Sequence, residues 1–327
     1  MKVYTEEQSI ARLNDLGRKK RAFIFIIDYS GQNSYIEEID RIDPSEVLYD
    51  FNGYSNYTSP CTLQNAPILW NTFPESFESY NESFNIVKTN ILSGNSFLAN
   101  LTCQTPIETN LSLTDIFSRS KALYKLYIKD HFVVFSPEIF IRINGNQISS
   151  YPMKGTIDAT LPHARALLLD DVKESAEHAT IVDLIRNDLS MVSKDVSVKR
   201  YRYVDTLKTN EGSILQTSSE IVGQLPENYP EHLGEIIFKL LPAGSITGAP
   251  KVKTKEIIHQ AEKYDRGFYT GIAGYYDGHR LDSAVMIRFI EQKENQLYFK
   301  SGGGITFQSE AESEYHEMKQ KVYVPIY

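Results

Sequence analysis

The last third of the sequence contains strands that follow one another across very short turns, and this pattern restricts the fold. The turns lie at Asp277-Gly278 and near Asn295, where the residue types favour tight connections. Strands joined in this way run antiparallel, because a parallel pair needs a crossover of a dozen or more residues. Three strands are predicted here, at residues 270–276, 281–292 and 297–301, and the glycine triplet 302–304 is expected to break the last one.

The rest of the chain also groups its helices and strands instead of alternating them. The predicted elements are strands at 22–29 and within 131–143, helices at 73–92, 172–192, 231–241 and about 309–322, and a loop with short strands at 43–66. No linker-like stretch divides the chain. We therefore expect an α+β fold, in which a single large domain, residues 1–327, has mostly antiparallel sheets with helices packed outside.

Charge and cysteine content argue against several classes of function. The net charge of −8 argues against broad nucleic-acid binding. No segment approaches the roughly 18 apolar residues that a membrane span needs. Cys61 and Cys103 provide neither a disulfide framework nor the spacing of metal ligands. We therefore expect a cytoplasmic protein.

Lys154 stands in an unusual context, the stretch PMKGT at residues 152–156. Proline fixes its own φ and disfavours the helical conformation for the residue before it. Gly155 lets the backbone turn or lie close to another group. A lysine between two such residues is expected to be held in place, either as an ordinary loop lysine or as a functional group.

The stretch AGSITGAPK, residues 243–251, is a glycine-rich loop that leads into a predicted helix. Free N–H groups and the positive end of the helix dipole favour an anion at such a place. The loop is not a nucleotide P-loop, because Ala249-Pro250 separate the last glycine from Lys251. A tight turn between two helices is the alternative interpretation.

Acidic residues recur at helical spacing near the C-terminus. Glu310, Glu314, Glu317 and Lys321 fall on one face of the predicted helix. Such a face is either solvated or holds a hard divalent ion, as Mg²⁺ prefers carboxylate oxygens and water. Glu177 lies on or beside the apolar stripe of the helix at 172–192, where an unpaired carboxylate is costly.

Two further features each allow a structural and a functional interpretation. The triplet Gly302-Gly303-Gly304 is either a flexible loop or a place where a ligand lies against backbone N–H groups. Glu138 follows a proline within an apolar strand. It is either a surface residue at a strand edge or a buried acid with a raised pKa.

Together these segments resemble the chorismate-utilising enzymes. The resemblance is carried by PMKGT (152–156), EHATIVDLIRNDL (177–189), GSITGAPK (244–251), RGFYTGIAGYY (266–276) and GGG…SEAESEYHE (302–317). It runs in order from about Gly94 to the C-terminus, so residues 94–327 are interpreted as the family core. Residues 1–71 are interpreted as a shortened N-terminal part of the same fold. The resemblance implies the fold of that family and a chorismate-converting enzyme.

Within the family, the resemblance is closest to the aminodeoxychorismate synthases. These enzymes typically read P-I-K-G-T, whereas relatives that form anthranilate usually carry alanine at the position of Lys154. In the synthases this lysine is the proposed nucleophile on the chorismate ring, and a glutamate at the position of Glu138 is the proposed acid. The resemblance thus implies that chorismate and ammonia give 4-amino-4-deoxychorismate through a lysine adduct, for para-aminobenzoate and folate synthesis. The alternative is anthranilate synthase or another chorismate enzyme.

The resemblance also implies sites for magnesium and for the substrate. Glu177, Glu314 and Glu317 match residues around Mg²⁺, which would neutralise the ring carboxylate. The residues implied in substrate binding are Gly155, Thr156, Thr247, Tyr269, Arg288, Gly302, Gly303, Gly304 and Lys321.

Ammonia must have a separate source, because neither cysteine lies in the Gly-x-Cys-x-Gly elbow of a class I glutaminase. We expect a glutamine amidotransferase subunit as partner, or the use of free ammonia. The chain departs from the family pattern at residues 157–159, where arginines often follow Gly-Thr. It departs again at Gln216, where relatives often have a histidine linked to pyruvate elimination. A catalytically inactive binding subunit is the alternative from another functional class.

Overall fold

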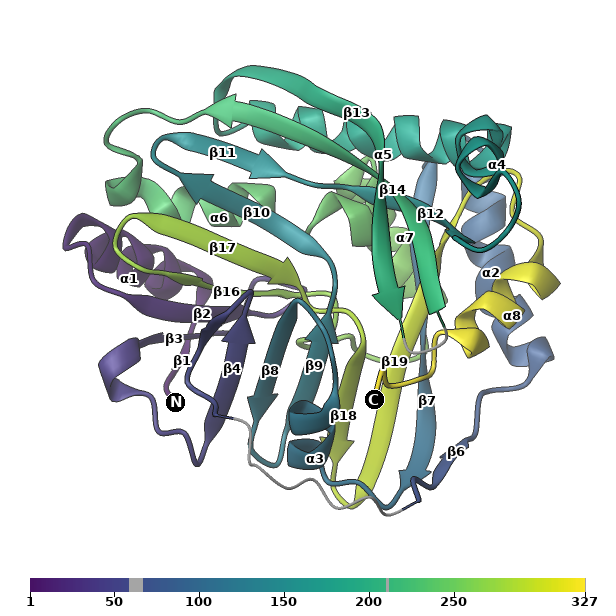
Figure 1. Ribbon diagram of the computed structural model, residues 1–327, viewed down its shortest axis with the longest axis horizontal. Coiled ribbons are helices and arrows are strands. Elements are labelled where there is room, and N and C mark those ends of the chain that lie inside the picture. Colours follow the sequence, from purple (N-terminus) through teal and green to yellow (C-terminus); the bar gives the residue numbers. More distant parts are fainter. Residues whose placement is uncertain (59–66, 210–211, 327) are drawn as a thin grey trace. The chain divides into compact units, whose positions relative to one another are not determined.

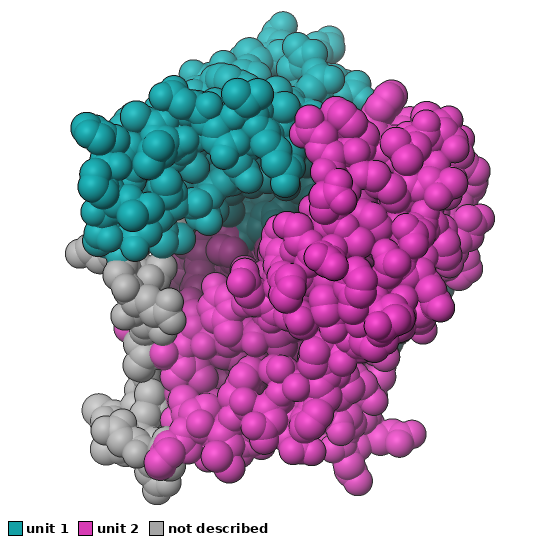
Figure 2. Space-filling view, turned by 90° about the vertical axis from the view of Figure 1, so that its right-hand side faces the viewer, with its two compact units in different colours: residues 1–39, 138–245, 272–285 teal, residues 40–137, 246–271, 286–327 magenta. Residues whose placement is uncertain are grey.

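The computed structural model describes residues 1–58, 67–209 and 212–326. Its strands form two antiparallel sheets, one of ten and one of nine strands within these ranges. The chain divides into two compact units, each built around one sheet and coloured separately in Figure 2. Unit 1 is Met1–Ile39, Glu138–Ser245 and Ile272–Val285, and unit 2 is Asp40–Pro137, Ile246–Gly271 and Met286–Tyr327. The predicted antiparallel α+β fold is confirmed, whereas the single domain stays a prediction.

Unit 1 contains the ten-stranded sheet, in the order β1-β3-β2-β16-β17-β10-β11-β14-β12 with β13 paired to β14 (Figure 1). Its strands are β1 (Val3–Tyr4), β2 (Phe23–Ile27), β3 (Ser34–Glu38), β10 (Ile139–Asn144), β11 (Gln147–Ser150), β12 (Met153–Asp158), β13 (Lys194–Thr209), β14 (Gly212–Gln224), β16 (Ile272–Tyr276) and β17 (Arg280–Val285). Its helices are α1 (Glu6–Arg18), α4 (Ala164–Asp170), α5 (Val172–Ser190), the short η2 (Tyr229–His232) and α6 (Leu233–Leu240). Helix α1 packs against α6, and α5 packs against β12, β13 and β14.

Unit 2 contains the nine-stranded sheet, in the order β15-β7-β19-β18-β9-β8-β4-β5 with β6 paired to β7. Its strands are β4 (Val47–Phe51), β5 (Tyr54–Ser55), β6 (Trp70–Thr72), β7 (Leu98–Thr109), β8 (Tyr124–Ile128), β9 (Phe132–Ser136), β15 (Gly248–Ala249), β18 (Phe289–Lys293) and β19 (Gln296–Ile305). Its helices are α2 (Phe77–Leu92), α3 (Leu113–Arg119), α7 (Lys251–Ala261) and α8 (Ala311–Gln320). Short 3₁₀ turns, η1 (Ile39–Arg41) and η3 (Gly244–Ile246), lie where the chain passes from one unit to the other.

The single strand predicted at 281–292 is wrong, because the chain changes sheets within it. Strand β17 belongs to the ten-stranded sheet and β18 to the nine-stranded sheet. Arg288 lies between the two strands and has a φ of 53°, a left-handed conformation that few residues other than glycine adopt. Both strands are largely buried, so the apolar pattern continues across the change and does not reveal it.

The expectation that the glycine triplet breaks the last strand is also wrong. Strand β19 continues to Ile305 and pairs with β7 across all three glycines. A Cβ atom on Gly302 would lie only 2.5 Å from the carbonyl oxygen of Leu101 in β7. Glycine is therefore what permits the two backbones to approach this closely.

The other long elements agree with the sequence pattern. The helices predicted at 172–192 and about 309–322 are α5 and α8, and the strand predicted at 22–29 is β2, in which every residue is buried. Cys103 is a buried, free cysteine in β7, whereas Cys61 and the rest of 59–66 lie outside the described residues. None of the helices in the described ranges has the length and apolar character needed to cross a bilayer.

Candidate active site

Lys154 lies on β12 at a β-bulge. Lys154 pairs with Thr217 of β14 and Thr156 pairs with Gln216, so Gly155 is an extra residue without a partner. Gly155 has a φ of 69°, and a Gly in this conformation is typical of one class of bulge. The hydroxyl of Thr217 donates a hydrogen bond to the Lys154 carbonyl. The bulge sets the direction in which the Lys154 side chain leaves the sheet.

We expect Gly155→Ala to be more destabilising than an ordinary glycine substitution at positive φ. A Cβ at Gly155 would lie 3.1 Å from Glu174 Oε2 and 3.2 Å from Leu168 Cδ1. Gly145, in the β10–β11 turn, has a similar φ of 59° and open space around it, so it is a matched control. Gly145→Ala should cost about 1 kcal/mol and Gly155→Ala about 2 kcal/mol or more. Denaturant unfolding measures both, and equal losses would show that the contacts at Gly155 are unimportant.

Helix α5 places carboxylates beside Lys154. Asp171 caps the helix by accepting the N–H of Glu174 at 2.9 Å. Glu177 Oε2 lies 3.4 Å from Lys154 Nζ, and Glu177 Oε1 lies 3.9 Å from Lys173 Nζ. Burial, and then the charge of Glu177, raise the pKa of Glu174. The helix thus places two carboxylates one turn apart, next to Lys154.

His178 anchors this part of α5 to the sheet. Its side chain is fully buried, and Nε2 lies 2.7 Å from the hydroxyl of Ser219 in β14. The same hydroxyl accepts the N–H of Arg202 at 2.9 Å. Burial, reinforced by the charges of Arg202 and Lys154, lowers the pKa of His178 to about 4. His178 is therefore neutral at physiological pH and fixes the position of its neighbour Glu177.

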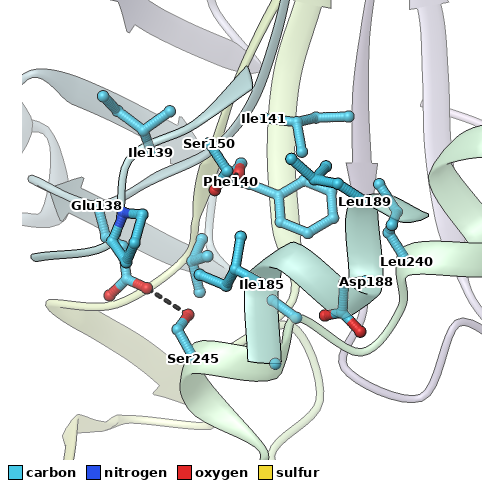
Figure 3. Close-up of a pocket in the computed structure, with 14 residues that line it drawn as sticks. Glu138, Ile139, Phe140, Ile141, Ser150, Ile185, Asp188, Leu189, Leu240 and Ser245 are labelled. Carbon is cyan, nitrogen blue, oxygen red and sulfur yellow. Dashed lines mark hydrogen bonds between the residues drawn. The ribbon is translucent and has the colours of Figure 1, made fainter. Parts of the chain in front are cut away.

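Glu138 directly precedes β10, at the point where the chain returns from unit 2 to unit 1. Its carboxylate accepts a hydrogen bond from the hydroxyl of Ser245, as Figure 3 shows. The two residues border a cavity of about 30 Å³, which has room for one or two molecules of the size of water. Apolar side chains form most of its wall, among them Phe140, Ile141, Ile185, Leu189 and Leu240. Glu138 is thus a partly buried acid beside apolar walls, not an isolated surface carboxylate.

The loop at 243–251 spans the boundary between the two units. Ser245 ends a segment of unit 1, whereas Thr247 belongs to unit 2 and is fully buried. Gly248-Ala249 form β15 and pair with β7, and Pro250 is the N-cap of α7. This strand pairing gives the loop a structural role. Anion binding by the loop stays a prediction.

In unit 2, α8 presents its charged residues to the glycine strand. Lys321 Nζ lies 2.7 Å from Glu317 Oε1 and donates to the Gly302 carbonyl at 2.8 Å. A Cβ atom on Gly303 would lie 3.3 Å from Glu314 Oε2 and 3.8 Å from Glu317 Oε1. Glu314 is buried. The bare backbone of the triplet, two carboxylates and one ammonium group therefore lie together.

Tyr269 and Arg288 are also in unit 2. Tyr269 is almost fully buried, and this burial raises its pKa far above the usual value, although the charges of Arg266 and Arg288 partly offset the effect. The carbonyl of Arg288 accepts the N–H of Phe135 at 3.0 Å, which holds the left-handed backbone in place. The guanidinium of Arg288 lies 5.3 Å from the ring centre of Tyr323.

The predicted site residues divide between the two units. Unit 1 contains Glu138, Lys154, Gly155, Thr156 and Glu177, and unit 2 contains Thr247, Tyr269, Arg288, Gly302, Gly303, Gly304, Glu314, Glu317 and Lys321. The predicted magnesium ligands are split in the same way. Over residues 1–58, 67–209 and 212–326 no three His, Cys, Asp or Glu side chains form a metal-binding group. Neither unit alone therefore provides the complete predicted ligand set.

The sequence interpretation missed two residues that lie beside predicted site residues. Glu174 shares a face of α5 with Glu177, and the spacing of three residues could have indicated it. Ser245 stands inside the GSITGAPK motif, but nothing in its local sequence indicates a carboxylate partner more than a hundred positions earlier.

Comparison with known proteins identifies the family. The family model described as chorismate binding enzyme matches residues 24–326. The chain belongs to this family. The match begins well before Gly94, so more of the N-terminal part follows the family pattern than the sequence motifs indicated. The recognition of a chorismate-utilising enzyme is confirmed.

Three relatives show how this chorismate-binding enzyme compares with others. A protein of Haemophilus influenzae described as an uncharacterized PabA-like protein is 49% identical, covering 98% of this chain and 98% of its own length. Aminodeoxychorismate synthase component 1 of Bacillus subtilis is 30% identical, covering 76% of this chain but 55% of its own length. The crystal structure of anthranilate synthase component I from Streptococcus pneumoniae superimposes with a TM-score of 0.67 at 26% identity, covering 80% of this chain and 60% of that chain.

Proposed function

We propose that this chorismate-binding enzyme aminates chorismate at C4 to give 4-amino-4-deoxychorismate. The observation that carries the proposal is the placement of Lys154, which a β-bulge directs and the Glu177 carboxylate holds. Amination through a covalent intermediate needs an ordered amine of this kind. The similarity to aminodeoxychorismate synthase component 1 supports the same assignment.

In the proposed reaction Lys154 is the nucleophile. Its ammonium group gives a proton to solvent, and the neutral amine leaves its ion pair with Glu177. Nζ then forms a bond to C2 of the chorismate ring and releases a second proton to solvent. The ring double bonds shift and the C4–O bond breaks. The hydroxyl leaves as water, with a proton from the carboxyl of Glu138. Ammonia then bonds to C4, the double bonds shift back, and the electron pair of the C2–N bond returns to Lys154, which takes up the proton that the new ammonium group at C4 loses.

Glu138 suits the role of acid because of its surroundings. Apolar side chains line the cavity beside it, and the hydroxyl of Ser245 fixes the direction of the carboxyl group. A general acid must be held in a fixed direction toward the atom that it protonates.

Glu177 of unit 1 and Glu314 and Glu317 of unit 2 are proposed to hold Mg²⁺, and Glu174 lies beside Glu177 on α5. All are hard oxygen donors of the kind that Mg²⁺ prefers. Burial is the main cause of the raised pKa of Glu174, and the charge of the neighbouring Glu177 adds to it. A cation would offset the repulsion between these two carboxylates. When bound, a divalent cation would neutralise these carboxylates and bind a carboxylate of the substrate.

The remaining predicted residues are proposed to bind the dianionic substrate. Arg288 and Lys321 supply positive charge, and the absence of side chains on the glycine strand lets the substrate approach the backbone closely. The Tyr269 hydroxyl stays protonated because burial raises its pKa, so it can donate a hydrogen bond to a carboxylate. Gly155, Thr156 and Thr247 are proposed to line the ring.

Ammonia is proposed to come from a glutamine amidotransferase subunit. Cys103 cannot replace such a subunit, because burial raises the pKa of its thiol well above the usual range and the thiolate is the reactive form. Cys61 lies outside the described residues, and its sequence context is not that of a glutaminase nucleophile.

Product analysis tests the proposal. We expect the purified chain with chorismate, Mg²⁺ and an ammonium salt to form a product with the mass of 4-amino-4-deoxychorismate. Glutamine in place of ammonium should give no turnover by the chain alone. Fluorescent anthranilate as the product would show that the enzyme is an anthranilate synthase. Absence of any chorismate conversion would refute the catalytic assignment.

A further inference from the structure

Unit 2 contains a buried ion pair that the proposed mechanism does not use. The Arg266 guanidinium and the Glu262 carboxylate are joined by two hydrogen bonds, Nη2 to Oε1 at 2.6 Å and Nε to Oε2 at 2.8 Å. Their side chains are 2% and 3% exposed. Burying two charges is costly, and apolar residues of similar size often stabilise a protein as well or better. The pair therefore calls for an explanation beyond stability.

Arg266 connects three segments that carry proposed chorismate-binding groups. Its Nη1 donates to the Ile246 carbonyl at 3.0 Å, directly before Thr247, and lies 3.3 Å from the Thr270 hydroxyl, directly after Tyr269. Its Nη2 donates to the Asn100 carbonyl in β7 at 2.6 Å. One planar, rigid donor group thus holds the backbone next to Thr247, Tyr269 and the glycine strand.

The ion pair also contacts two residues of β7 that pair with the glycine triplet. Asn100, which accepts from Arg266, pairs with Gly304. Thr102, which pairs with Gly302, donates both its N–H and its hydroxyl to Glu262 Oε1, each at 2.8 Å. The contacts therefore fall at the two residues of β7 that face the first and third glycines.

The backbone of Arg266 is fixed as well. Its carbonyl accepts from the fully buried Lys300 Nζ at 2.9 Å and from the N–H of Tyr269 at 3.0 Å. Thr270 has a φ of 61°, a left-handed conformation that is strained for a β-branched residue. Such strain persists only where several contacts hold the residue, so the turn that carries Tyr269 is held in place from several directions.

We propose that Arg266, clamped by Glu262, is a positioning residue that orders Thr247, Tyr269 and the glycine strand into one rigid cradle for the substrate. The inference rests on the chorismate-binding roles proposed above. Arg266 itself is buried behind these groups and does not need to touch chorismate. Its effect comes from pre-organisation, because ordering the three segments beforehand removes the entropy cost of ordering them on binding.

Chorismate binding by Arg266→Lys tests the proposal. Lysine keeps a positive charge beside Glu262, but it lacks the planar guanidinium group whose nitrogens donate to all three segments. We expect the Kd for chorismate, measured by calorimetry, to rise by about tenfold or more and kcat/KM to fall by about 100-fold. The double variant Arg266→Met/Glu262→Met removes both charges together and is used if the lysine variant does not fold.

Ile116→Val is the matched control for stability. Ile116 is a fully buried residue of α3 in the same unit, and it takes no part in these contacts. The control should lower the unfolding temperature without changing the Kd for chorismate.

Three outcomes decide the question. A wild-type Kd in a folded Arg266 variant, or an equal loss of binding in Ile116→Val, overturns the positioning role and leaves the proposed function untouched. A wild-type chain that neither binds nor converts chorismate overturns both.

Discussion

Replacing Lys154 by alanine is expected to abolish amination of chorismate while the folded chain still binds the substrate. The variant removes the proposed nucleophile but keeps Glu138, the carboxylates and the binding residues of unit 2. Loss of a nucleophile is among the largest single-residue effects on catalysis, so the rate should fall by at least about 10³-fold. Product formation followed by mass spectrometry, together with the Kd for chorismate, checks the expectation.

Lys173→Ala is the matched control, because Lys173 also pairs with Glu177, at 3.9 Å. The Lys173 side chain is half exposed, and a pair of this kind contributes little, about 0–1 kcal/mol. The control should retain close to the wild-type rate. If Lys154→Ala also aminates chorismate at the wild-type rate, Lys154 has no catalytic role. The argument for this activity over anthranilate synthase would then be lost.

Removing divalent cations with a chelator is expected to stop turnover, and Mg²⁺ should restore it. Glu317→Gln should raise the Mg²⁺ concentration needed for half-maximal rate strongly, because an amide oxygen carries no charge to attract the cation. A titration of the rate against Mg²⁺ measures this shift.

Glu312→Gln is the control for the magnesium titration. Glu312 is an exposed residue of the same helix, α8, five positions before Glu317 and on a different side. Glu312→Gln removes the same negative charge from the same helix. Its Mg²⁺ requirement therefore measures the general effect of losing one charge from α8. An equal Mg²⁺ requirement in wild type and Glu317→Gln would remove Glu317 from the metal site.

Features that depend on local spacing could be predicted from the sequence. The helix periodicity at 172–192 places Glu177 beside a buried stripe, and Glu177 is indeed only partly exposed. The Gly155 context predicts an unusual backbone, and the structure has a bulge at positive φ there. The helix at about 309–322 places Glu314, Glu317 and Lys321 on one face, and all three lie against Gly303.

Features that depend on distant partners could not be predicted. The chain changes sheets around Pro137 and again around Arg288. Ser136-Pro137 marks only an interruption between two strands, and apolar residues continue on both sides of Arg288, so neither pattern shows that the sheet changes. The glycine triplet stays within a strand because β7, about two hundred residues earlier, pairs with it. Glu262 and Arg266 look like an ordinary helical pair at a spacing of four. Only the tertiary structure shows that they are buried and bonded to Thr102 and Asn100.

A covalent adduct on Lys154 is the most direct test of the central claim. Wild-type chain is mixed with chorismate and Mg²⁺ without ammonia, quenched and digested with trypsin. A modified Lys154 resists cleavage, so we expect a peptide of residues 143–165 heavier by chorismate less one water, and no such peptide from Lys154→Ala. Unmodified Lys154 throughout, in a chain that still aminates chorismate when ammonium is added, would contradict the proposed mechanism.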